Sequence, residues 1–434
     1  MALAQGARMS RGSSKIGVCR ASAGSGGGFP GAGRPLGMGR PSNFTVHRPY
    51  FNTTSEVHAA VTDAIAPGAP TLNGGSGAAA ATNGRAGFVP GRAVLEVPGW
   101  QDSLQARTAP ATSSSALGPL PSRLRIFSGT SNTALAAEVA SYLGTELGKI
   151  KIKRFADGEI YVQVGESIRG ADVFLVQPTS PPVNDHFMEL AVMIDACRRA
   201  SARSITAVIP YYGYARADRK TQGRESIAAK LTANLITEAG ADRVLAMDLH
   251  SGQTVGYFDI PVDHVYGESV ILDYLASKRI ATGELVVVSP DVGGVARARA
   301  FAKKLNDAPL AIVDKRRSAH NVSEVMNLIG DVRGKVAVLV DDMIDTAGTI
   351  TNSAKVLRQE GARAVYACAT HAVFSPPAVE RLSSGVFEEV IVTNTISMHP
   401  SNVFPELTVL SVANLLGETI WRVHSSTSVQ ALRD

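Results

Sequence analysis

The chain has 434 residues, of which 45% are hydrophobic and 19% charged, and its formal net charge is +5. This length leaves room for two or three domains. The positive excess comes from residues 1–120, which hold ten of the 43 basic residues and four of the 38 acidic ones. The remainder, with 33 basic and 34 acidic residues, is nearly neutral, so its charge predicts no nucleic-acid partner. No apolar stretch reaches the length of a membrane span, and Cys19, Cys197 and Cys368 lack metal-ligand spacing.

Residues 1–120 are predicted to be a disordered leader that carries an organellar transit peptide. Residues 1–55 contain no Asp or Glu but six arginines and Lys15, a composition typical of transit peptides. The run 74–87 is mostly Gly and Ala and cannot bury enough apolar surface to fold. The alternative is a disordered tail without a targeting role.

From residue 122 onward, short β-rich runs alternate with helical patterns. The first series predicts strands at 124–128, 172–177, 204–210 and 243–248, with helices at 132–143, 185–200 and 226–239. After a connector near 261–267, the second series predicts helices at 268–278, 293–305, 347–360 and 376–383 and from 411, with strands at 285–289, 310–314, 335–341, 364–370 and 389–393. This alternation predicts an α/β fold with two tandem doubly wound parallel-sheet domains, at 121–265 and 266–434.

The most informative stretch is 336–349, where an apolar strand runs into Asp341, Asp342, Asp345 and a turn of small and hydroxyl residues. In parallel sheets ligands bind beyond the carboxyl ends of the strands. The N–H groups of such a turn, at the start of a helix, suit a phosphate, and the acids suit sugar hydroxyls or Mg²⁺. The alternative is that the acids only end a strand and cap a helix. The stretch resembles the phosphoribosyl diphosphate-binding motif of ribose-phosphate diphosphokinases and type I phosphoribosyltransferases.

A second stretch, 154–161, places Asp157 and Gly158 between apolar residues, which predicts a tight hairpin. An exposed Phe155 with a neighbouring acid could stack on a purine and contact its amino group. A purely structural hairpin is the alternative.

The loop 210–226 carries four cations within nine residues, Arg216, Arg219, Lys220 and Arg224. Such a loop could close as a cationic lid over a polyphosphate, with arginine making bidentate contacts. A solvated surface loop is the more ordinary explanation of a charge run.

Three further sets lie at predicted strand ends. Asp248 and His250 follow one strand and Asp291 follows another, so His250 and Asp291 could converge on one Mg²⁺. Lys315 and Arg317, two residues apart, point the same way toward the crevice. A structural, hydrogen-bonded histidine is the alternative role of His250.

Together these stretches make residues 122–424 resemble ribose-phosphate diphosphokinase (phosphoribosyl diphosphate synthetase) of the phosphate-dependent class, in its plant and algal organellar form. The resemblance implies domains of the phosphoribosyltransferase type. It implies an enzyme that transfers the diphosphoryl group of MgATP to the 1-hydroxyl of ribose 5-phosphate, giving 5-phosphoribosyl 1-diphosphate and AMP for nucleotide, histidine and tryptophan biosynthesis. It further implies Mg²⁺ as cofactor and a homohexamer with ATP sites at subunit interfaces. The leader then indicates the chloroplast, with the mitochondrion as alternative.

The same resemblance assigns roles to individual residues. The catalytic cations would be Lys315 and Arg317. The ATP-binding residues would be Phe155, Asp157, Gly158, Glu159, Arg216, Ala217 and His250. The ribose 5-phosphate-binding residues would be Arg317, Asp341, Asp342, Asp345, Thr346, Ala347, Gly348 and Thr349. The candidate metal ligands are Asp248, His250, Asp259, Asp263 and Asp291.

The sequence also departs from the family pattern. Asp157 stands where many relatives carry Asn, and the loop 219–225 differs from the Lys- and Asp-rich version of animal enzymes. Phosphate activation and ADP inhibition are therefore not predicted. Two rivals remain, a type I phosphoribosyltransferase and a non-catalytic synthetase-associated subunit. Two tandem halves and the hairpin argue against the first, and the retained Lys315, Arg317 and His250 argue against the second.

Overall fold

A computed structural model of the chain describes residues 123–316 and 325–432. The predicted leader and Arg317 lie outside these described residues. Within the described residues, no helix is both long enough and apolar enough to cross a membrane.

The first half contains a five-stranded parallel sheet in the order β1-β4-β5-β6-β7. Its strands are β1 (Leu124–Ser128), β4 (Asp172–Val176), β5 (Ser204–Ile209), β6 (Arg243–Met247) and β7 (Val262–Val265). Its helices are α2 (Thr133–Tyr142), α3 (Val183–Arg199) and α4 (Ala228–Ala239), with the short 3-10 helix η1 (Gly252–Tyr257). Strands β2 (Ile150–Arg154) and β3 (Ile160–Val164) form a separate antiparallel hairpin.

The second half contains a seven-stranded sheet in the order β10-β9-β8-β11-β12-β13-β14. Its strands are β8 (Leu285–Ser289), β9 (Leu310–Arg316), β10 (Val325–Ile329), β11 (Val336–Ile344), β12 (Ala364–Ala372), β13 (Glu389–Thr393) and β14 (Leu407–Leu410). Its helices are α5 (Glu268–Ser277), α6 (Val295–Lys304), α7 (Gly348–Gln359) and α8 (Ala378–Leu382), with 3-10 helices η2 (Thr282–Glu284) and η3 (Pro400–Asn402). All pairs are parallel except β9–β10.

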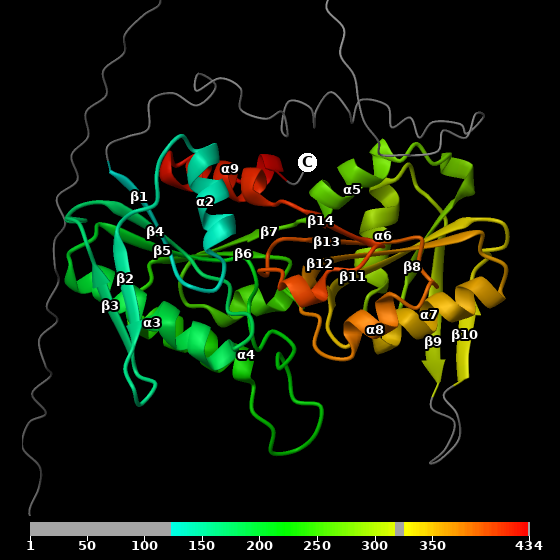
Figure 1. The fold of residues 1–434 in the computed structure, drawn as a ribbon, viewed down its shortest axis with the longest axis horizontal. Helices are drawn as coiled ribbons and strands as arrows, with labels where there is room; N and C mark the ends of the chain where they lie inside the picture. The colour runs from blue at the N-terminus through cyan, green and yellow to red at the C-terminus, as the bar shows by residue number, and fades with distance from the viewer. Residues whose placement is uncertain (1–122, 317–324, 433–434) are drawn as a thin grey trace, which may run out of the picture. The chain divides into compact units, whose positions relative to one another are not determined.

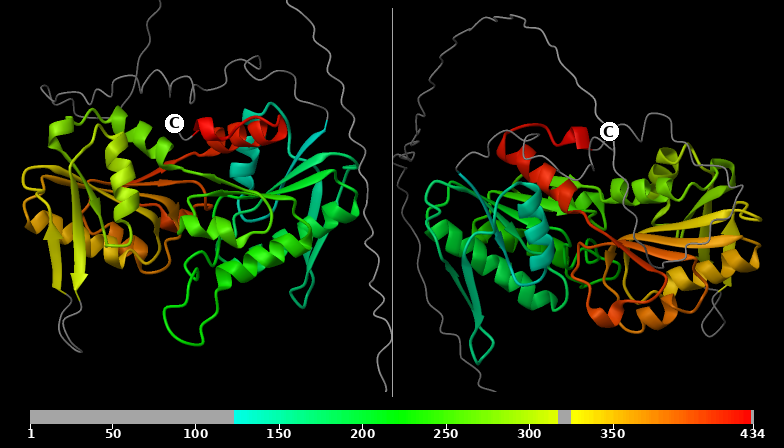
Figure 2. Two further views of the ribbon diagram at one scale, coloured as in Figure 1. Left: turned by 180° about the vertical axis from the view of Figure 1, so that it is seen from behind. Right: turned by 45° about the horizontal axis from the view of Figure 1, so that its top comes forward.

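Helices cover both faces of each sheet, as a doubly wound fold requires (Figures 1 and 2). In the second half, the cores formed with α5 and α6 and with α7 and α8 lie on opposite faces. The strands between these layers are almost entirely apolar, and β8, with the sequence LVVVS, is buried along its whole length. Such continuous Val and Leu runs are typical of parallel strands that are covered on both sides. The predicted fold class is confirmed.

The strand order of the second sheet reverses between β8 and β11, because the chain passes from β8 outward to β9 but from β11 outward to β12. Ligands of open α/β sheets bind in the crevice at such a switch point. Asp291 follows β8, and Asp341 and Asp342 lie near the end of β11. The topology therefore places these predicted residues on adjacent strands.

The C-terminal helix α9 (Ala413–His424), followed by the 3-10 helix η4 (Gln430–Leu432), packs against α2 of the first half (Figure 1). Leu416 and Ile420 share one buried core with Leu135 and Val139 of α2. The chain was expected to keep its last helix with the second half, so packing crosses the predicted division. The domain boundaries themselves stay a prediction.

Candidate functional site

Strand β11 continues through the acids of the motif, beyond the end at residue 341 that the sequence predicts. Asp341 pairs in register with Ala369 of β12, and β11 ends at Ile344. The turn then passes through Ala347, whose φ of 59° is left-handed, and α7 begins at Gly348. No side chain caps the start of α7. Its first N–H groups therefore face outward from a turn of small residues, as the motif predicts for a phosphate cradle.

Arg297, on the first turn of α6, binds the acid pair. Its Nη1 lies 2.9 Å from Asp341 Oδ1 and 3.0 Å from Asp342 Oδ1, and its Nη2 donates to the main-chain oxygen of His250 at 3.4 Å. His250 Nδ1 in turn donates to Asp342 Oδ2 at 2.8 Å. The acids of β11 and the histidine that follows β6 thus form one cluster, which arginine partly neutralises.

The two acids of the cluster have opposite electrostatic tendencies. Burial, together with the neighbouring charge of Asp342, raises the pKa of Asp341. Burial also opposes the ionisation of Asp342, but the hydrogen bond from His250 and the charge of Arg297 outweigh it and lower its pKa. The same hydrogen bond raises the pKa of His250 against the effect of burial. One carboxylate of the pair is therefore held ionised while ionisation of the other is disfavoured.

Two further arginines contact the turn after β11. Arg216 Nη1 donates to Asp345 Oδ2 at 2.5 Å, which joins the cationic loop of the first half to this turn. Arg381 of α8 donates from Nη1 to the main-chain oxygen of Thr346 at 2.8 Å. Sequence reasoning missed Arg297 and Arg381, because neither lies within a motif and each is recognised only by its contacts.

Hydrogen bonds order the loop that contains Arg216 near both of its ends. Ala217 donates to Tyr214 and accepts from Ala229 through main-chain groups. Farther along, the Glu225 carboxylate accepts the N–H groups of Thr221 and Gln222 at 2.8 and 3.0 Å, and these bonds lower its pKa. The predicted cationic loop therefore has local order.

The hairpin predicted at 154–161 is present. Gly158 adopts a φ of 95°, and Phe155 N donates to the main-chain oxygen of Glu159 at 2.8 Å. The ring of Phe155 is 55% exposed and meets only the edge of Tyr161 among the aromatic contacts of the described residues. An exposed ring beside Asp157 and Glu159 has the form expected of a base-stacking platform.

The candidate metal residues separate into two groups. Asp259 lies 3.8 Å from Lys230 and Asp263 lies 2.8 Å from Arg243, so both acids already have cationic partners. Asp248 Oδ2 accepts from Thr370 Oγ1 at 2.6 Å and from Gly267 N at 2.8 Å.

Asp291 and His250 remain accessible. Asp291 is exposed, although its Oδ1 also accepts the N–H of Gly294 at the start of α6 at 2.7 Å. In the part of the chain that the structure describes, no three His, Cys, Asp or Glu side chains are grouped to hold a metal ion. A Mg²⁺ that is held mainly by substrate phosphates and water needs only one or two carboxylates from the protein, and the exposed Asp291 could supply one.

The two catalytic candidates are only partly placed. Lys315 lies near the end of β9, where its backbone pairs with Met326 of the antiparallel strand β10. Arg317 falls outside the described residues. Lys315 therefore lies on an antiparallel pair of strands at the edge of the second sheet.

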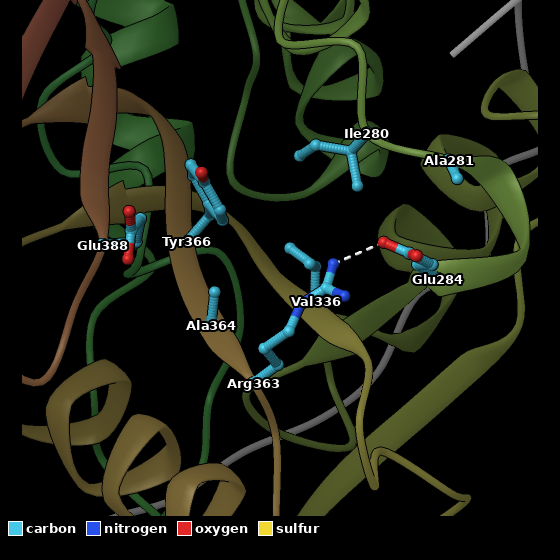
Figure 3. A pocket seen from close by; sticks show the side chains of 8 residues that line it. All are labelled: Ile280, Ala281, Glu284, Val336, Arg363, Ala364, Tyr366 and Glu388. Carbon is cyan, nitrogen blue, oxygen red and sulfur yellow. Dashed lines mark hydrogen bonds and ion pairs between the residues drawn. The ribbon is translucent and has the colours of Figure 1, made fainter. Parts of the chain in front are cut away.

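A separate hollow lies at the amino ends of β11 and β12, away from the acids (Figure 3). It is lined by Ile280, Ala281, Glu284, Val336, Arg363, Ala364, Tyr366 and Glu388. Arg363 forms an ion pair with Glu284 across it. None of the predicted site residues contributes to this hollow.

Comparison with known proteins decides the family. Residues 124–240 match the family model described as the N-terminal domain of ribose phosphate pyrophosphokinase. Residues 310–433 match the model described as a phosphoribosyl synthetase-associated domain. Ribose-phosphate pyrophosphokinase 1 of Spinacia oleracea is 79% identical over 310 residues, which make up 71% of this chain and 92% of that protein. The chain belongs to the ribose-phosphate pyrophosphokinase family.

Other members of the ribose-phosphate pyrophosphokinase family agree. The chloroplastic ribose-phosphate pyrophosphokinase 5 of Arabidopsis thaliana is 79% identical over 306 residues, 70% of this chain and 78% of that protein. The crystal structure of the phosphoribosylpyrophosphate synthetase of Mycobacterium smegmatis matches with a TM-score of 0.67 and 44% identity, covering 70% of this chain and 99% of that one. The predicted family is thus confirmed.

Proposed function

We propose that the protein transfers the diphosphoryl group of MgATP to ribose 5-phosphate. The 1-hydroxyl oxygen attacks the β-phosphorus of ATP, the bond from that phosphorus to the α,β-bridging oxygen breaks, and the hydroxyl proton is lost. The products are 5-phospho-α-D-ribose 1-diphosphate and AMP. Membership of the ribose-phosphate pyrophosphokinase family supports this reaction.

The observation that carries the sugar site is the end of β11. Its acids, Asp341, Asp342 and Asp345, would face the ribose hydroxyls, while the turn 346–349 would cradle the 5-phosphate. The uncapped start of α7 and the left-handed Ala347 support the cradle, because outward N–H groups and the helix dipole favour an anion.

ATP would bind between the loop of the first half and the hairpin of a neighbouring subunit. Phe155 would stack on adenine, with Asp157, Gly158 and Glu159 beside it, and Arg216, Ala217 and His250 would lie at the phosphates. The exposed ring of Phe155 supports this assignment. The hairpin would act on the ATP site of a neighbouring subunit, in a homohexamer.

Catalysis would rest on position and charge, since phosphoryl transfer demands little covalent chemistry from the protein. Lys315 and Arg317 would stabilise negative charge on the diphosphoryl group during transfer. Bound Mg²⁺, with Asp291 and His250 as its protein ligands, would neutralise further phosphate charge. Asp248, Asp259 and Asp263 are assigned supporting roles instead, because each already has a side-chain partner, Thr370, Lys230 and Arg243 respectively, that lies outside the cluster around Asp342.

We also propose that residues 1–120 direct the protein to the chloroplast, and that the folded part divides near residue 265. The acid-poor leader supports the first proposal, and so do the relatives from plants that are named chloroplastic. The two separate sheets, at 124–265 and 285–410, support the second.

The purified full chain should release AMP from MgATP only when ribose 5-phosphate is present. Ribose without its phosphate is the matched control for the cradle, and EDTA is the control for the metal. Diphosphate release from phosphoribosyl diphosphate and a nucleobase would favour the phosphoribosyltransferase alternative. Inactivity in both assays, with a folded protein, would favour the non-catalytic subunit.

A further inference from the structure

Asp248, which follows β6, forms hydrogen bonds with two residues of β12. Asp248 Oδ2 accepts a hydrogen bond from Thr370 Oγ1 at 2.6 Å, and the main-chain oxygen of Asp248 lies 3.1 Å from His371 Nε2. Thr370 and His371 are neighbours on β12 and are 4% and 1% exposed. Two adjacent buried residues of the second sheet therefore hold one residue of the first by its side chain and its backbone.

The geometry fixes the tautomer of His371. A carbonyl oxygen can only accept, so Nε2 must carry the proton that is donated to Asp248. Nδ1 is then an acceptor and lies 2.9 Å from Thr395 Oγ1, which is also 3.2 Å from the main-chain oxygen of Thr370. Burial lowers the pKa of His371 to about 4, which keeps the ring neutral. The edge of Tyr211, with ring centroids 5.1 Å apart, packs against it. His371 is thus a fixed support.

The fastened residue adopts an unusual backbone conformation. Asp248 has a φ of 39°, and non-glycine residues keep such a conformation only where their surroundings determine it. Gly267 donates to the same carboxylate oxygen at 2.8 Å, and a Cβ at Gly267 would lie 3.0 Å from that oxygen and 3.1 Å from Thr370 Cγ2. Two other chain segments, β12 and the turn at Gly267, therefore converge on Asp248.

The bend at Asp248 determines where His250 lies, because only Leu249 separates them. His250 Nδ1 reaches Asp342 Oδ2 at 2.8 Å, and Leu249 N is tied to His264 Nε2 at 3.0 Å. We propose that Thr370 and His371 are positioning residues, which hold Asp248 so that His250 meets Asp342 in the geometry that the reaction needs. This inference rests on the proposed function, in which His250 lies at the ATP phosphates and Mg²⁺.

The first test replaces the hydroxyl of Thr370 in the full chain. Thr370→Val keeps the shape and removes the donor, and we expect kcat to fall at least about tenfold, the effect of losing one hydrogen bond to a charged group. The KM values for ATP and ribose 5-phosphate should change by less than about threefold, since Thr370 is not assigned to either substrate. Thr370→Ser should restore most of kcat. Thr419→Val, an equally buried isosteric change on α9, is the matched control and should leave kcat unchanged.

The second test asks whether Thr370 acts through His250. In a double-mutant cycle, Thr370→Val should lower kcat by less than about twofold once His250→Ala is present, because the positioned group is gone. The same fold loss in both backgrounds would mean that Thr370 only supports the fold, and would overturn the proposal. A His250→Ala protein with unchanged kcat would also overturn it, while normal AMP release would leave the proposed reaction standing.

Thermal unfolding of each variant separates loss of positioning from loss of folding. If Thr370→Val does not fold, Thr395→Val offers a second change, because it removes a hydroxyl that contacts His371 Nδ1 at 2.9 Å and the main-chain oxygen of Thr370 at 3.2 Å. We expect Thr395→Val to lower kcat in the wild-type background and not in the His250→Ala background. An unchanged kcat in folded Thr395→Val would overturn the role of His371.

Discussion

Arg216 and Asp345 lie 129 positions apart in the sequence and form an ion pair across the two halves, with Nη1 2.5 Å from Oδ2. The first is assigned to the ATP phosphates and the second to the ribose. Under these assignments, each substrate would compete with a contact that the protein makes within itself. Asp345 keeps its carboxylate ionised in this arrangement, because hydrogen bonds from Ser375 and Arg216 lower its pKa against the effect of burial.

Asp345→Asn should weaken the binding of ribose 5-phosphate and leave ATP affinity nearly unchanged. An exposed ion pair contributes only about 0.2–1 kcal/mol, so its loss should alter ATP affinity by less than about fivefold. Calorimetric titration with each substrate separately measures both effects. A large loss of ATP affinity would contradict the assignment of Asp345 to the sugar.

Thr349→Val should weaken ribose 5-phosphate binding by about 10- to 150-fold, which corresponds to one lost hydrogen bond of roughly 1.5–3 kcal/mol to a charged group. Thr351→Val is the matched control, since the buried Thr351 hydroxyl has no hydrogen-bond partner among the described residues. Calorimetric titration with ribose 5-phosphate measures the affinity of each variant. If Thr349→Val binds as tightly as the parent, the turn is not the phosphate cradle.

Lys315→Ala should lower kcat by about 10²–10³-fold with little change in substrate affinity, because its charge is assigned to the transition state. Lys303→Ala, an exposed cation of α6, is the control for general charge effects. Initial rates of AMP release at varied substrate concentrations give kcat and KM. An unchanged kcat would reduce Lys315 to a surface cation.

Phe155→Ala should raise KM for ATP and spare ribose 5-phosphate, since its exposed ring is assigned to adenine alone. Because the hairpin is assigned to a neighbouring subunit, mixed assemblies of Phe155→Ala and Lys315→Ala should be more active at low ATP than the two proteins measured separately. Equal loss of affinity for both substrates would instead indicate a role in folding or assembly.

The pairing of His250 with Asp342 predicts a pH-dependent stability in the substrate-free protein. The pKa of His250 is raised in the folded state, so the folded protein binds this proton more tightly than the unfolded chain does. The stabilisation should be complete below the unfolded pKa of about 6.5 and should disappear as pH rises through the raised folded value. Urea unfolding of wild type and His250→Asn across this range measures it. A stability difference that grows with pH would contradict the pairing.

The sequence predicts what lies close together along the chain. Asp341 lies in β11, Asp345 in the turn after it and Thr349 in the first turn of α7, so local pattern was sufficient to predict this strand, turn and helix. The strands that sequence reasoning missed, β7, β10 and β14, are all at sheet edges. Edge strands pair on one side only and are often short, so they carry a weaker apolar pattern. The region of β7 was interpreted as a connector for this reason.

Local sequence patterns do not predict contacts between residues that lie far apart in the chain. Arg297 reaches Asp341 from another strand–helix unit, 44 positions away in the sequence, and Thr370 reaches Asp248 over 122. No local pattern distinguishes these residues from ordinary members of a helix or a strand. The fold had to bring them together before their role could be recognised.

The packing of α9 on α2 has a consequence for synthesis on the ribosome. The first sheet leaves the exit tunnel early, yet part of its apolar face is covered by Leu416 and Ile420, which are made only after the whole second sheet. A nascent chain that carries only the first half therefore exposes part of a hydrophobic face until α9 is made. Such surfaces are where chaperones bind and where premature termination leads to aggregation.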